Sequence, residues 1–303
     1  MKKNKIIQDI EKLKKEKNAI ILAHSYQIPE VQEVADIVGD SLALSKAATE
    51  VDNEVIVFCG VNFMAESAKI LSPNKKVLLP IKSAGCPMAD MVSAKRLRQY
   101  KKNNPDTTIV CYVNSSASVK AESDICCTSS NALKVVESID SDKILFVPDR
   151  NLGNYVKNNV KNKQVELWPG FCPTHNNISL REALKIKEEH PEAEILVHPE
   201  CSEKVIELAD FVGSTSQIIK YANESNSKEF LIGTEMGVLH ILRKQNPNKE
   251  FDLLYHNLLC PDMKKTRLED VLNALMYEQH EINVEEDIRQ RALIALNKML
   301  EIS

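Results

Sequence analysis

Residues 195–217 read ILVHPECSEKVIELADFVGSTSQ, and their pattern predicts a short α/β unit. The apolar run at the start is typical of a buried parallel strand. His198 and Glu200 follow where that strand should end, and because they are two residues apart they point the same way in an extended chain. A second short strand at 210–212 and a helix that opens at 214–215 complete the unit.

The same unit occurs three times along the chain. In each copy a strand-end residue precedes an aspartate by 12 residues: His24 and Asp36, Tyr112 and Asp124, His198 and Asp210. A second strand-end residue precedes a hydroxyl residue by 15 residues: Tyr26 and Ser41, Asn114 and Ser129, Glu200 and Thr215. The three copies are offset by 88 and then 86 residues. Repeats of this length indicate repeated α/β domains, because the repeats of solenoid proteins are shorter.

The alternation of strands and helices predicts an α/β fold of three homologous small domains, each with a parallel four-stranded sheet, in a pseudo-threefold arrangement. The predicted strands lie at 20–23, 36–38, 55–58, 77–79, 109–113, 124–126, 144–147, 165–168, 195–197, 210–212, 230–232 and 251–254. The predicted domains are 1–86 with a leading helix at 1–17, then 87–172 and 173–260. For the remaining residues, 261–303, the sequence predicts C-terminal helices that pack on the repeats.

Two capping-box spacings mark the starts of these C-terminal helices. Thr266 precedes Glu269 by three residues, and Asn283 precedes Glu286 by three residues. Apolar residues follow each pair at helical spacing. We therefore expect two helices that cover one of the three domains.

The composition is that of an ordinary soluble protein. The chain has 303 residues, a formal net charge of −4 and 43% hydrophobic residues. The composition has no excess of basic residues that would indicate nucleic-acid binding. No apolar stretch has the length and pattern of a signal peptide or of a membrane span. We predict a cytoplasmic protein with no membrane partner, whose eight cysteines are reduced thiols or metal ligands rather than disulfides.

Three cysteines occupy the same place in the three repeats. Cys86, Cys172 and Cys260 each precede a proline, with separations of 86 and 88 residues. Three thiolates that converge on one axis favour a metal site. With His175 they would make a Cys₃His zinc site, whereas a [4Fe–4S] cluster held by three cysteines would keep one iron open. Spacing alone does not separate these two, and the shared Cys-Pro context argues against a third interpretation as core cysteines.

The other cysteines favour a structural interpretation. Two fall in predicted strands, two lie at a strand end and one follows Glu200, and no Cys-x-x-Cys occurs. We predict that all five are small buried hydrophobic residues: Cys59, Cys111, Cys126, Cys127 and Cys201.

The strand ends and helix starts predict one composite pocket. Ligands of open α/β sheets bind beyond the carboxyl ends of the strands. If the three domains face one axis, their strand-end pairs line the same cavity. Ser41, Ser129 and Thr215 should lie at three helix starts, where free N–H groups and the helix dipole favour anions. The alternative is plain N-capping, but equivalent placement in all three repeats favours ligand contact.

A set of sequence stretches from residue 23 to residue 266 supports a more specific hypothesis. They read AHSYQ (23–27), VGDS (38–41), GVNFMAES (60–67), AGCPMAD (84–90), YVNS (112–115), CTSSN (127–131), PDRNLG (148–153), WPGFCPTH (168–175), HPEC (198–201), VGSTS (212–216), GTEMG (233–237) and CPDMKKT (260–266). In this combination and order the chain resembles the quinolinate synthase family of NAD biosynthesis.

The resemblance implies a triangular three-domain fold with a central active site and one [4Fe–4S] cluster on Cys86, Cys172 and Cys260. It implies the condensation of iminoaspartate with dihydroxyacetone phosphate to quinolinate, phosphate and water. It also implies functional pairing with an enzyme that produces iminoaspartate. The positions matching substrate contacts are His24, Ser41, Tyr112, Asn114, Ser129, His198, Glu200 and Thr215. Tyr26 and His175 match positions linked to the chemistry.

Two departures from the family pattern are small. Asn62 stands where many members have histidine, and Cys260 stands alone where some members carry Cys-x-x-Cys-x-x-Cys. The second departure argues against thiol-based redox control and leaves the cluster ligands unchanged.

The residues suggest roles in the reaction. A carboxylate can move a proton to and from carbon, so Glu200 is the expected general base, with Tyr26 and His24 as a proton shuttle. Two other hypotheses remain at this point: a different iron–sulfur hydro-lyase that consumes no triose phosphate, and a zinc-stabilised scaffold or small-anion binding module without catalysis.

Overall fold

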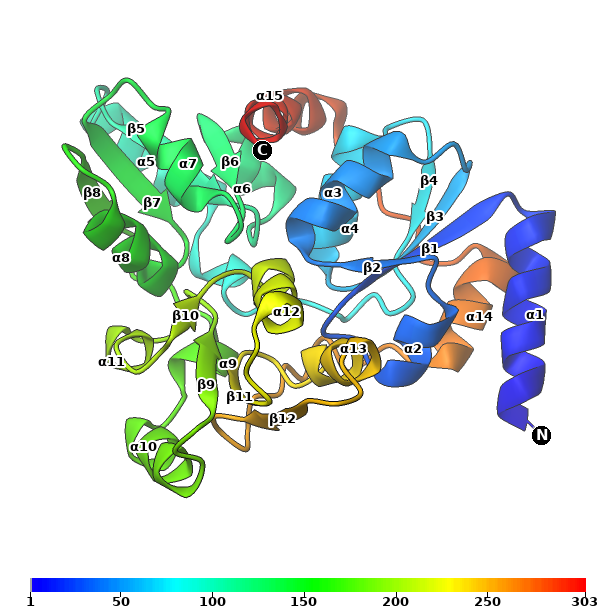
Figure 1. Ribbon diagram of the computed structural model, residues 1–303. Helices are drawn as coiled ribbons and strands as arrows, with labels where there is room; N and C mark the ends of the chain where they lie inside the picture. The colour runs from blue at the N-terminus through cyan, green and yellow to red at the C-terminus, as the bar shows by residue number, and fades with distance from the viewer. Residues whose placement is uncertain (1) are drawn as a thin grey trace.

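Three parallel four-stranded sheets form the framework of the computed structural model, which describes residues 2–303 (Figure 1). The strand orders are β2-β1-β3-β4, β6-β5-β7-β8 and β10-β9-β11-β12, so all three sheets share one topology. We call each sheet with its flanking helices the first, second and third domain. The predicted fold class is confirmed. The predicted domain boundaries remain a prediction and fall in the loops after β4, β8 and β12.

Each predicted strand is present, with ends that differ by at most one residue from the expected ones. The first sheet contains β1 (Ala19–His24), β2 (Ile37–Gly39), β3 (Val55–Cys59) and β4 (Lys76–Leu78). The second contains β5 (Thr108–Tyr112), β6 (Ile125–Cys127), β7 (Lys143–Val147) and β8 (Gln164–Leu167). The third contains β9 (Glu194–Val197), β10 (Phe211–Val212), β11 (Glu229–Gly233) and β12 (Glu250–Leu253).

Helices flank the sheets and connect consecutive strands. In the first domain these are α1 (Lys2–Glu16), α2 (Pro29–Val34), α3 (Ser41–Glu50) and α4 (Asn62–Leu71). A 3₁₀ turn at Ala89–Met91 leads to α5 (Ala94–Asn103), α6 (Ala117–Ala121), α7 (Ala132–Glu137) and α8 (Arg150–Asn159). The rest are α9 (Pro173–Asn176), α10 (Leu180–Glu189), α11 (Glu203–Ile206), α12 (Thr215–Glu224), α13 (Val238–Gln245), α14 (Leu268–Tyr277) and α15 (Glu286–Ile302).

The recurring aspartates have a structural role in each domain. The Oδ2 atoms of Asp36, Asp124 and Asp210 accept hydrogen bonds of 2.8 Å from the backbone N–H groups of Ile21, Ile109 and Ile195. Each aspartate therefore ties the start of the second strand to the first strand of its sheet. This contact explains why the aspartate recurs at a fixed spacing.

Of the three predicted helix starts, those at Ser41 and Thr215 are confirmed and that at Ser129 is wrong. Asp40 rather than Ser41 caps α3, and Ser214 rather than Thr215 caps α12. Helix α7 begins only at Ala132, so Ser129 lies in the preceding turn. Ser41 and Thr215 are the first helical residues after their caps, because the flanking Asp40 and Ser214 side chains reach the free N–H groups.

The C-terminal helices also begin later than their capping-box spacings predicted. The N-cap residue of α14 is Arg267 rather than Thr266, and that of α15 is Glu285 rather than Asn283. The expectation that both helices cover one domain is wrong as well. Helix α14 packs on α1 and β3, whereas α15 packs on α6 and β6 (Figure 1).

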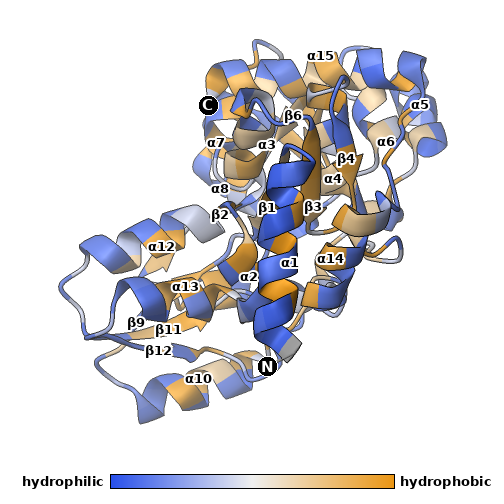
Figure 2. Cartoon of the chain, turned by 90° about the vertical axis from the view of Figure 1, so that its right-hand side faces the viewer, coloured by the Kyte–Doolittle hydropathy of each residue, from blue (hydrophilic) through white to orange (hydrophobic). Residues whose placement is uncertain are grey.

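The apolar cores divide the molecule unequally. One continuous buried cluster joins the first and second domains and includes Leu22 and Phe58 of the first and Val110 and Phe146 of the second. The two apolar clusters of the third domain consist wholly of residues between 178 and 258. The third domain accordingly forms a separate lobe in Figure 2, where its helices turn their hydrophobic residues toward its own sheet.

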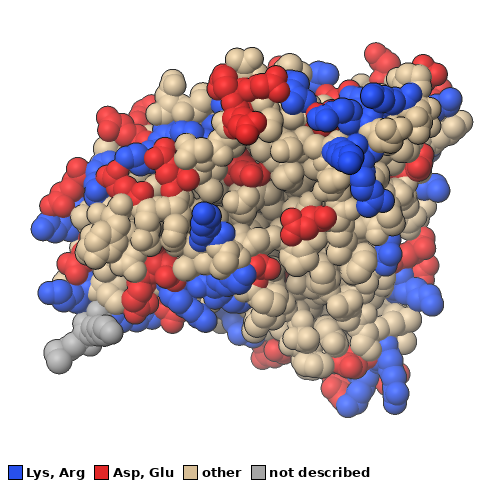
Figure 3. All heavy atoms as spheres, turned by 180° about the vertical axis from the view of Figure 1, so that it is seen from behind, with Lys and Arg blue, Asp and Glu red and all other residues tan. Residues whose placement is uncertain are grey.

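The surface is charged and mixed. On the face shown in Figure 3, acidic and basic side chains are interspersed. Within residues 2–303, no helix combines the length and the apolar composition needed to cross a bilayer.

Candidate active site

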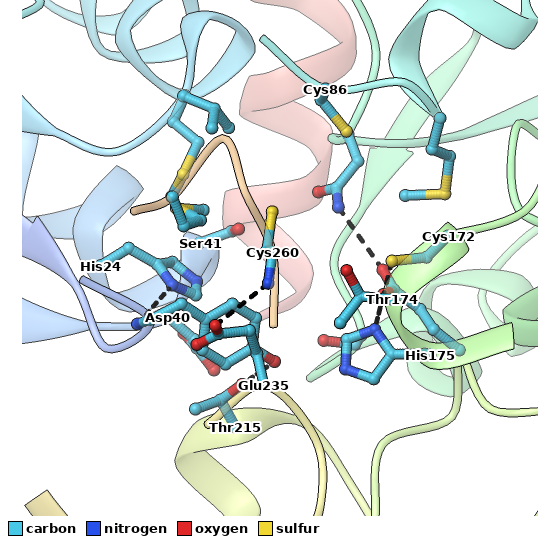
Figure 4. A pocket seen from close by; sticks show the side chains of 18 of the residues that line it. His24, Asp40, Ser41, Cys86, Cys172, Thr174, His175, Thr215, Glu235 and Cys260 are labelled. Carbon is cyan, nitrogen blue, oxygen red and sulfur yellow. Dashed lines mark hydrogen bonds and ion pairs between the residues drawn. The ribbon is translucent and has the colours of Figure 1, made fainter. Parts of the chain in front are cut away.

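A pocket lies where the three domains meet, and side chains from all three line it (Figure 4). Every candidate residue named from the sequence is among those that line it. They are His24, Tyr26, Ser41, Cys86, Tyr112, Asn114, Ser129, Cys172, His175, His198, Glu200, Thr215 and Cys260. The strand ends place them there, because the carboxyl ends of all three parallel sheets point toward the pocket.

The two strand-end histidines are held in one tautomer. The backbone N–H of Tyr26 donates to His24 Nδ1 at 3.1 Å, and that of Glu200 donates to His198 Nδ1 at 3.3 Å. Because Nδ1 accepts in each ring, a neutral ring carries its proton on Nε2. His198 Nε2 lies 3.1 Å from the Ser129 hydroxyl. Each histidine thus presents an Nε2–H donor on the side facing away from its own backbone.

Burial keeps these histidines neutral. It lowers the pKa of His24 to about 4, although the nearby Asp40 acts in the opposite direction. It lowers the pKa of His198 to about 3 despite the adjacent Glu200. At neutral pH both rings are therefore uncharged hydrogen-bond donors.

Glu200 is ionised although it is buried. Burial by itself would raise the pKa of this carboxyl group, but His198, His175 and a hydrogen bond from Tyr112 together lower it below its ordinary value. A neutral His198 carries no charge at pH 7, so hydrogen bonds from His175 and Tyr112 keep the carboxylate ionised. His175 Nδ1 lies 2.7 Å from Glu200 Oε2.

A chain of hydrogen bonds connects Tyr26 to Glu200. The Tyr26 hydroxyl lies 2.6 Å from Thr234 Oγ1, which lies 2.9 Å from His175 Nε2. His175 Nδ1 then contacts Glu200. Sequence reasoning did not find Thr234, which is fully buried at the end of β11. The only available signal was its place in the stretch GTEMG.

The pocket hydroxyls differ in their surroundings. Ser129 contacts His198, and Thr215 Oγ1 lies 2.8 Å from the Tyr26 hydroxyl. The expected free helix ends are not available, because Asp40 Oδ1 already accepts from Leu42 N and Ala43 N at the start of α3. At the start of α12, Gln217 N donates to Ser214 Oγ. The hydroxyls, not the helix N–H groups, therefore face a ligand.

One buried amide oxygen in the pocket has no partner among the described residues. Asn114 donates through Nδ2 to Glu200 Oε1 at 3.5 Å, but its Oδ1 is buried and unpaired. A buried acceptor without a donor is costly. The arrangement suits a ligand that brings an N–H or O–H group to this position.

The three Cys-Pro cysteines come from three loops and point into the pocket (Figure 4). Burial raises the pKa of each thiol, that of Cys86 to about 12. Backbone N–H groups two or three residues later act in the opposite direction on every one of them. These are Ala89 and Met88 for Cys86, His175 for Cys172, and Met263 and Asp262 for Cys260.

This pattern explains the Cys-Pro context physically. Proline has no N–H group and starts a tight turn, so the following N–H groups turn back toward the sulfur. Cys172 is the N-cap residue of α9, with extended backbone and Pro173 as the first helical residue. Sulfurs that receive N–H donors are suited to the thiolate form that binds metals, so the residues present fit a metal centre.

A mononuclear zinc site of Cys₃His type is less well matched. Both ring nitrogens of His175 are engaged, one by Thr234 and one by Glu200. Within residues 2–303, the ligand atoms that gather within 4.8 Å of one another are those of Cys172, His175 and Glu200, not those of the three cysteines. A zinc ion with Zn–S bonds of about 2.3 Å would bring its three sulfur ligands within 4.8 Å of one another.

Two further pocket residues were not named as candidates from the sequence. Glu235 is fully buried, accepts from Cys260 N at 3.1 Å and Gly237 N at 2.7 Å, and pairs with Lys264 at 2.9 Å. It therefore orients the Cys260 loop. Asp40 also lines the pocket and connects the three domains, as described below.

The remaining cysteines are buried, as predicted. All five are completely or almost completely buried, and none lines the pocket: Cys59, Cys111, Cys126, Cys127 and Cys201.

Comparison with known proteins identifies the family of this chain. A family model described as "Quinolinate synthetase A protein" matches residues 8–301. A quinolinate synthase of Alkaliphilus metalliredigens is 60% identical over 302 residues, covering 100% of both chains. One from Caldicellulosiruptor saccharolyticus is 58% identical over 299 residues, covering 99% of both, and one from Clostridium perfringens is 50% identical over 294 residues, covering 97% of this chain and 98% of the other. The chain therefore belongs to the quinolinate synthetase A protein family and is an enzyme.

Proposed function

We propose that this enzyme is a quinolinate synthase of NAD biosynthesis, which condenses iminoaspartate with dihydroxyacetone phosphate to quinolinate, phosphate and water. The observation that carries the proposal is the convergence of all candidate residues, drawn from three domains, on one pocket. The relatives that share at least half of the sequence carry the same name. The atoms balance with two waters released, so the reaction needs no external oxidant.

Cys86, Cys172 and Cys260 are the proposed ligands of a [4Fe–4S] cluster. Their thiols lie in three loops of the same pocket, each with backbone N–H donors toward the sulfur. When bound through three cysteines, such a cluster supplies an open iron that acts as a Lewis acid.

Neutral donors are proposed to bind the substrates. Within residues 2–303, no lysine or arginine lines the pocket, so the side chains that hold carboxylate and phosphate groups there are uncharged N–H and O–H donors. His24, His198 and the Ser41 hydroxyl supply such donors. The unpaired Asn114 Oδ1 then accepts from a substrate N–H or O–H. Burial strengthens each of these bonds, because water is excluded.

Glu200 is the proposed general base. Its ionised carboxylate accepts a proton, and His175 beside it can hold the carboxylate in place or return a proton. Tyr26 exchanges protons with the substrate, and Thr234 passes them to His175 along the hydrogen-bond chain. Burial raises the pKa of the Tyr26 hydroxyl well above its ordinary value, so this group acts as a proton donor and acceptor without ionising.

An activity assay tests the proposed function directly. Anaerobically purified enzyme with reconstituted cluster should form quinolinate and phosphate in equal amounts only when both substrates are present. Because iminoaspartate is unstable, an enzyme that oxidises aspartate can supply it in the assay, in line with the proposed pairing. Dehydration of a hydroxy acid without consumption of triose phosphate would instead indicate an iron–sulfur hydro-lyase.

Removal of the Ser41 hydroxyl should affect binding but not stability. Asp40 caps α3, so Ser41→Ala leaves the cap intact and the melting temperature close to that of the wild type. If the hydroxyl donates to a substrate carboxylate or phosphate, affinity should fall about tenfold to a hundredfold. Thr49→Ala, on an exposed part of the same helix, is the matched control. Unchanged affinity with a lower melting temperature would leave Ser41 only a structural role.

A further inference from the structure

The third domain is positioned against the other two by polar contacts. Its apolar clusters contain only its own residues. On one side, Gln32 Nε2 of α2 donates to the Gly237 carbonyl at 3.0 Å, and Glu33 accepts from Lys244 of α13 at 2.7 Å. On the other side lies the buried carboxylate of Asp40, which is 5% exposed.

Asp40 receives hydrogen bonds from all three domains. Its Oδ1 accepts from Leu42 N at 3.2 Å and Ala43 N at 3.1 Å, within its own domain. Its Oδ2 lies 2.9 Å from the Ser130 hydroxyl of the second domain and 3.2 Å from the Ser214 hydroxyl of the third. One oxygen of Asp40 therefore caps a helix, and the other joins three domains.

The hydroxyls around Oδ2 also contact one another. Ser130 Oγ lies 2.7 Å from Ser214 Oγ, and Ser216 N of α12 donates to Asp40 Oδ2 at 3.4 Å. Gln217 Nε2 adds a bond of 3.3 Å to the Ser130 carbonyl. Burial would raise the pKa of Asp40, but the hydrogen bonds from Ala43, Ser216 and Ser130 outweigh it and lower the pKa, so the carboxylate is charged. Hydrogen bonds to a charged acceptor are stronger than those between neutral groups.

The residues of this junction adjoin the pocket hydroxyls in sequence. Asp40 precedes Ser41, Ser130 follows Ser129, and Ser214 precedes Thr215. Any movement of the third domain that separates Ser214 from Asp40 also moves Thr215 away from Ser41. The junction therefore controls the spacing of three groups that face the ligand.

We propose that Asp40 is an interdomain clasp. Its carboxylate holds the third domain against the first and second, and thereby sets the distances among Ser41, Ser129 and Thr215. Asp40 is a positioning residue, because both oxygens of its carboxylate accept hydrogen bonds from the protein itself. The positions equivalent to Asp40 in the other two repeats are Thr128 and Ser214. Asp40 is therefore the only one of the three that provides a carboxylate as acceptor.

Asp40→Asn tests the clasp without removing the helix cap. Asparagine caps helices about as well as aspartate, but its amide presents an N–H donor where Oδ2 accepted. Hydrogen exchange of the cluster-loaded enzyme should show amides of 128–131 and the start of α12 exchanging about tenfold to a hundredfold faster, the effect of losing a hydrogen bond to a charged group. Wild-type exchange in both segments would overturn the proposal.

Ser130→Ala tests the same junction from the second domain. Asn131 rather than Ser130 is the N-cap of α7, so no cap is lost. The variant should raise exchange at the start of α12, which belongs to a different domain. Ser138→Ala, at the other end of α7, removes a hydroxyl that donates to a carbonyl of its own helix. This variant should leave hydrogen exchange at the start of α12 unchanged. Equal behaviour of the two serine variants would contradict the clasp.

The double variant and kinetics separate a clasp from a local effect. Asp40→Asn with Ser130→Ala should raise exchange less than the sum of the single changes, because both break one junction. On the proposed function, Asp40→Asn should raise the KM of the enzyme for its substrates more than it lowers kcat. The exchange measurements need no turnover, so they would stand even if the proposed reaction were wrong.

Discussion

Glu200→Gln is expected to lower kcat by about 10²–10⁴-fold while the fold and the cluster remain intact. The change nearly conserves the shape of the side chain but removes the proton acceptor that lies 2.7 Å from His175 Nδ1. Turnover should be measured anaerobically under saturating substrate, together with iron content and melting temperature on the same preparation.

The matched control for this prediction is Glu207→Gln. Glu207 lies in the same domain on the exposed surface, so its loss of charge should leave turnover unchanged. Near wild-type quinolinate formation by the Glu200 variant would refute its role as the base. Loss of iron in that variant would show instead that Glu200 supports the metal centre, as its closeness to Cys172 and His175 would allow.

Single replacements of Cys86, Cys172 or Cys260 by serine are expected to abolish cluster binding and activity. Thiolates are soft ligands that select iron–sulfur clusters, and a serine hydroxyl is a poor substitute. Iron and sulfide per chain and the visible absorbance of anaerobic protein measure the loss. A colourless wild-type protein that contains zinc would contradict the proposed cofactor.

The other cysteines provide the controls. Cys201→Ala and Cys126→Ala remove buried thiols that do not line the pocket, so iron content should stay at the wild-type level. The melting temperature should fall modestly in both, because a buried side chain becomes smaller. Cluster loss on changing Cys126, with Cys260 dispensable, would overturn the assignment of ligands.

The positions of the strands and the location of the pocket could be predicted from sequence because their causes are local. Each repeat contains its own strand-end pair and an aspartate such as Asp36, which bonds Ile21 15 residues earlier within the same sheet. The Cys-Pro turns likewise direct N–H groups to a sulfur two or three residues away. Because these contacts repeat at one spacing, the pattern was visible three times along the chain.

The capping residues of the helices were predicted less well than the helices themselves. Several neighbouring residues can serve as caps, so Ser41 and Thr215 were assigned the role that Asp40 and Ser214 have. Competition among adjacent side chains is decided by small differences in backbone geometry, which spacing does not reveal.

Contacts between domains were decided only by the tertiary structure. Thr234 contacts Tyr26, and Asp40 contacts Ser130 and Ser214, across separations of 90 to 208 residues. The chain by itself determined three similar sheets whose strand ends carry polar groups. Which of these groups touch depends on how the domains pack, and such contacts leave no periodic signal because each occurs once and breaks the threefold repeat.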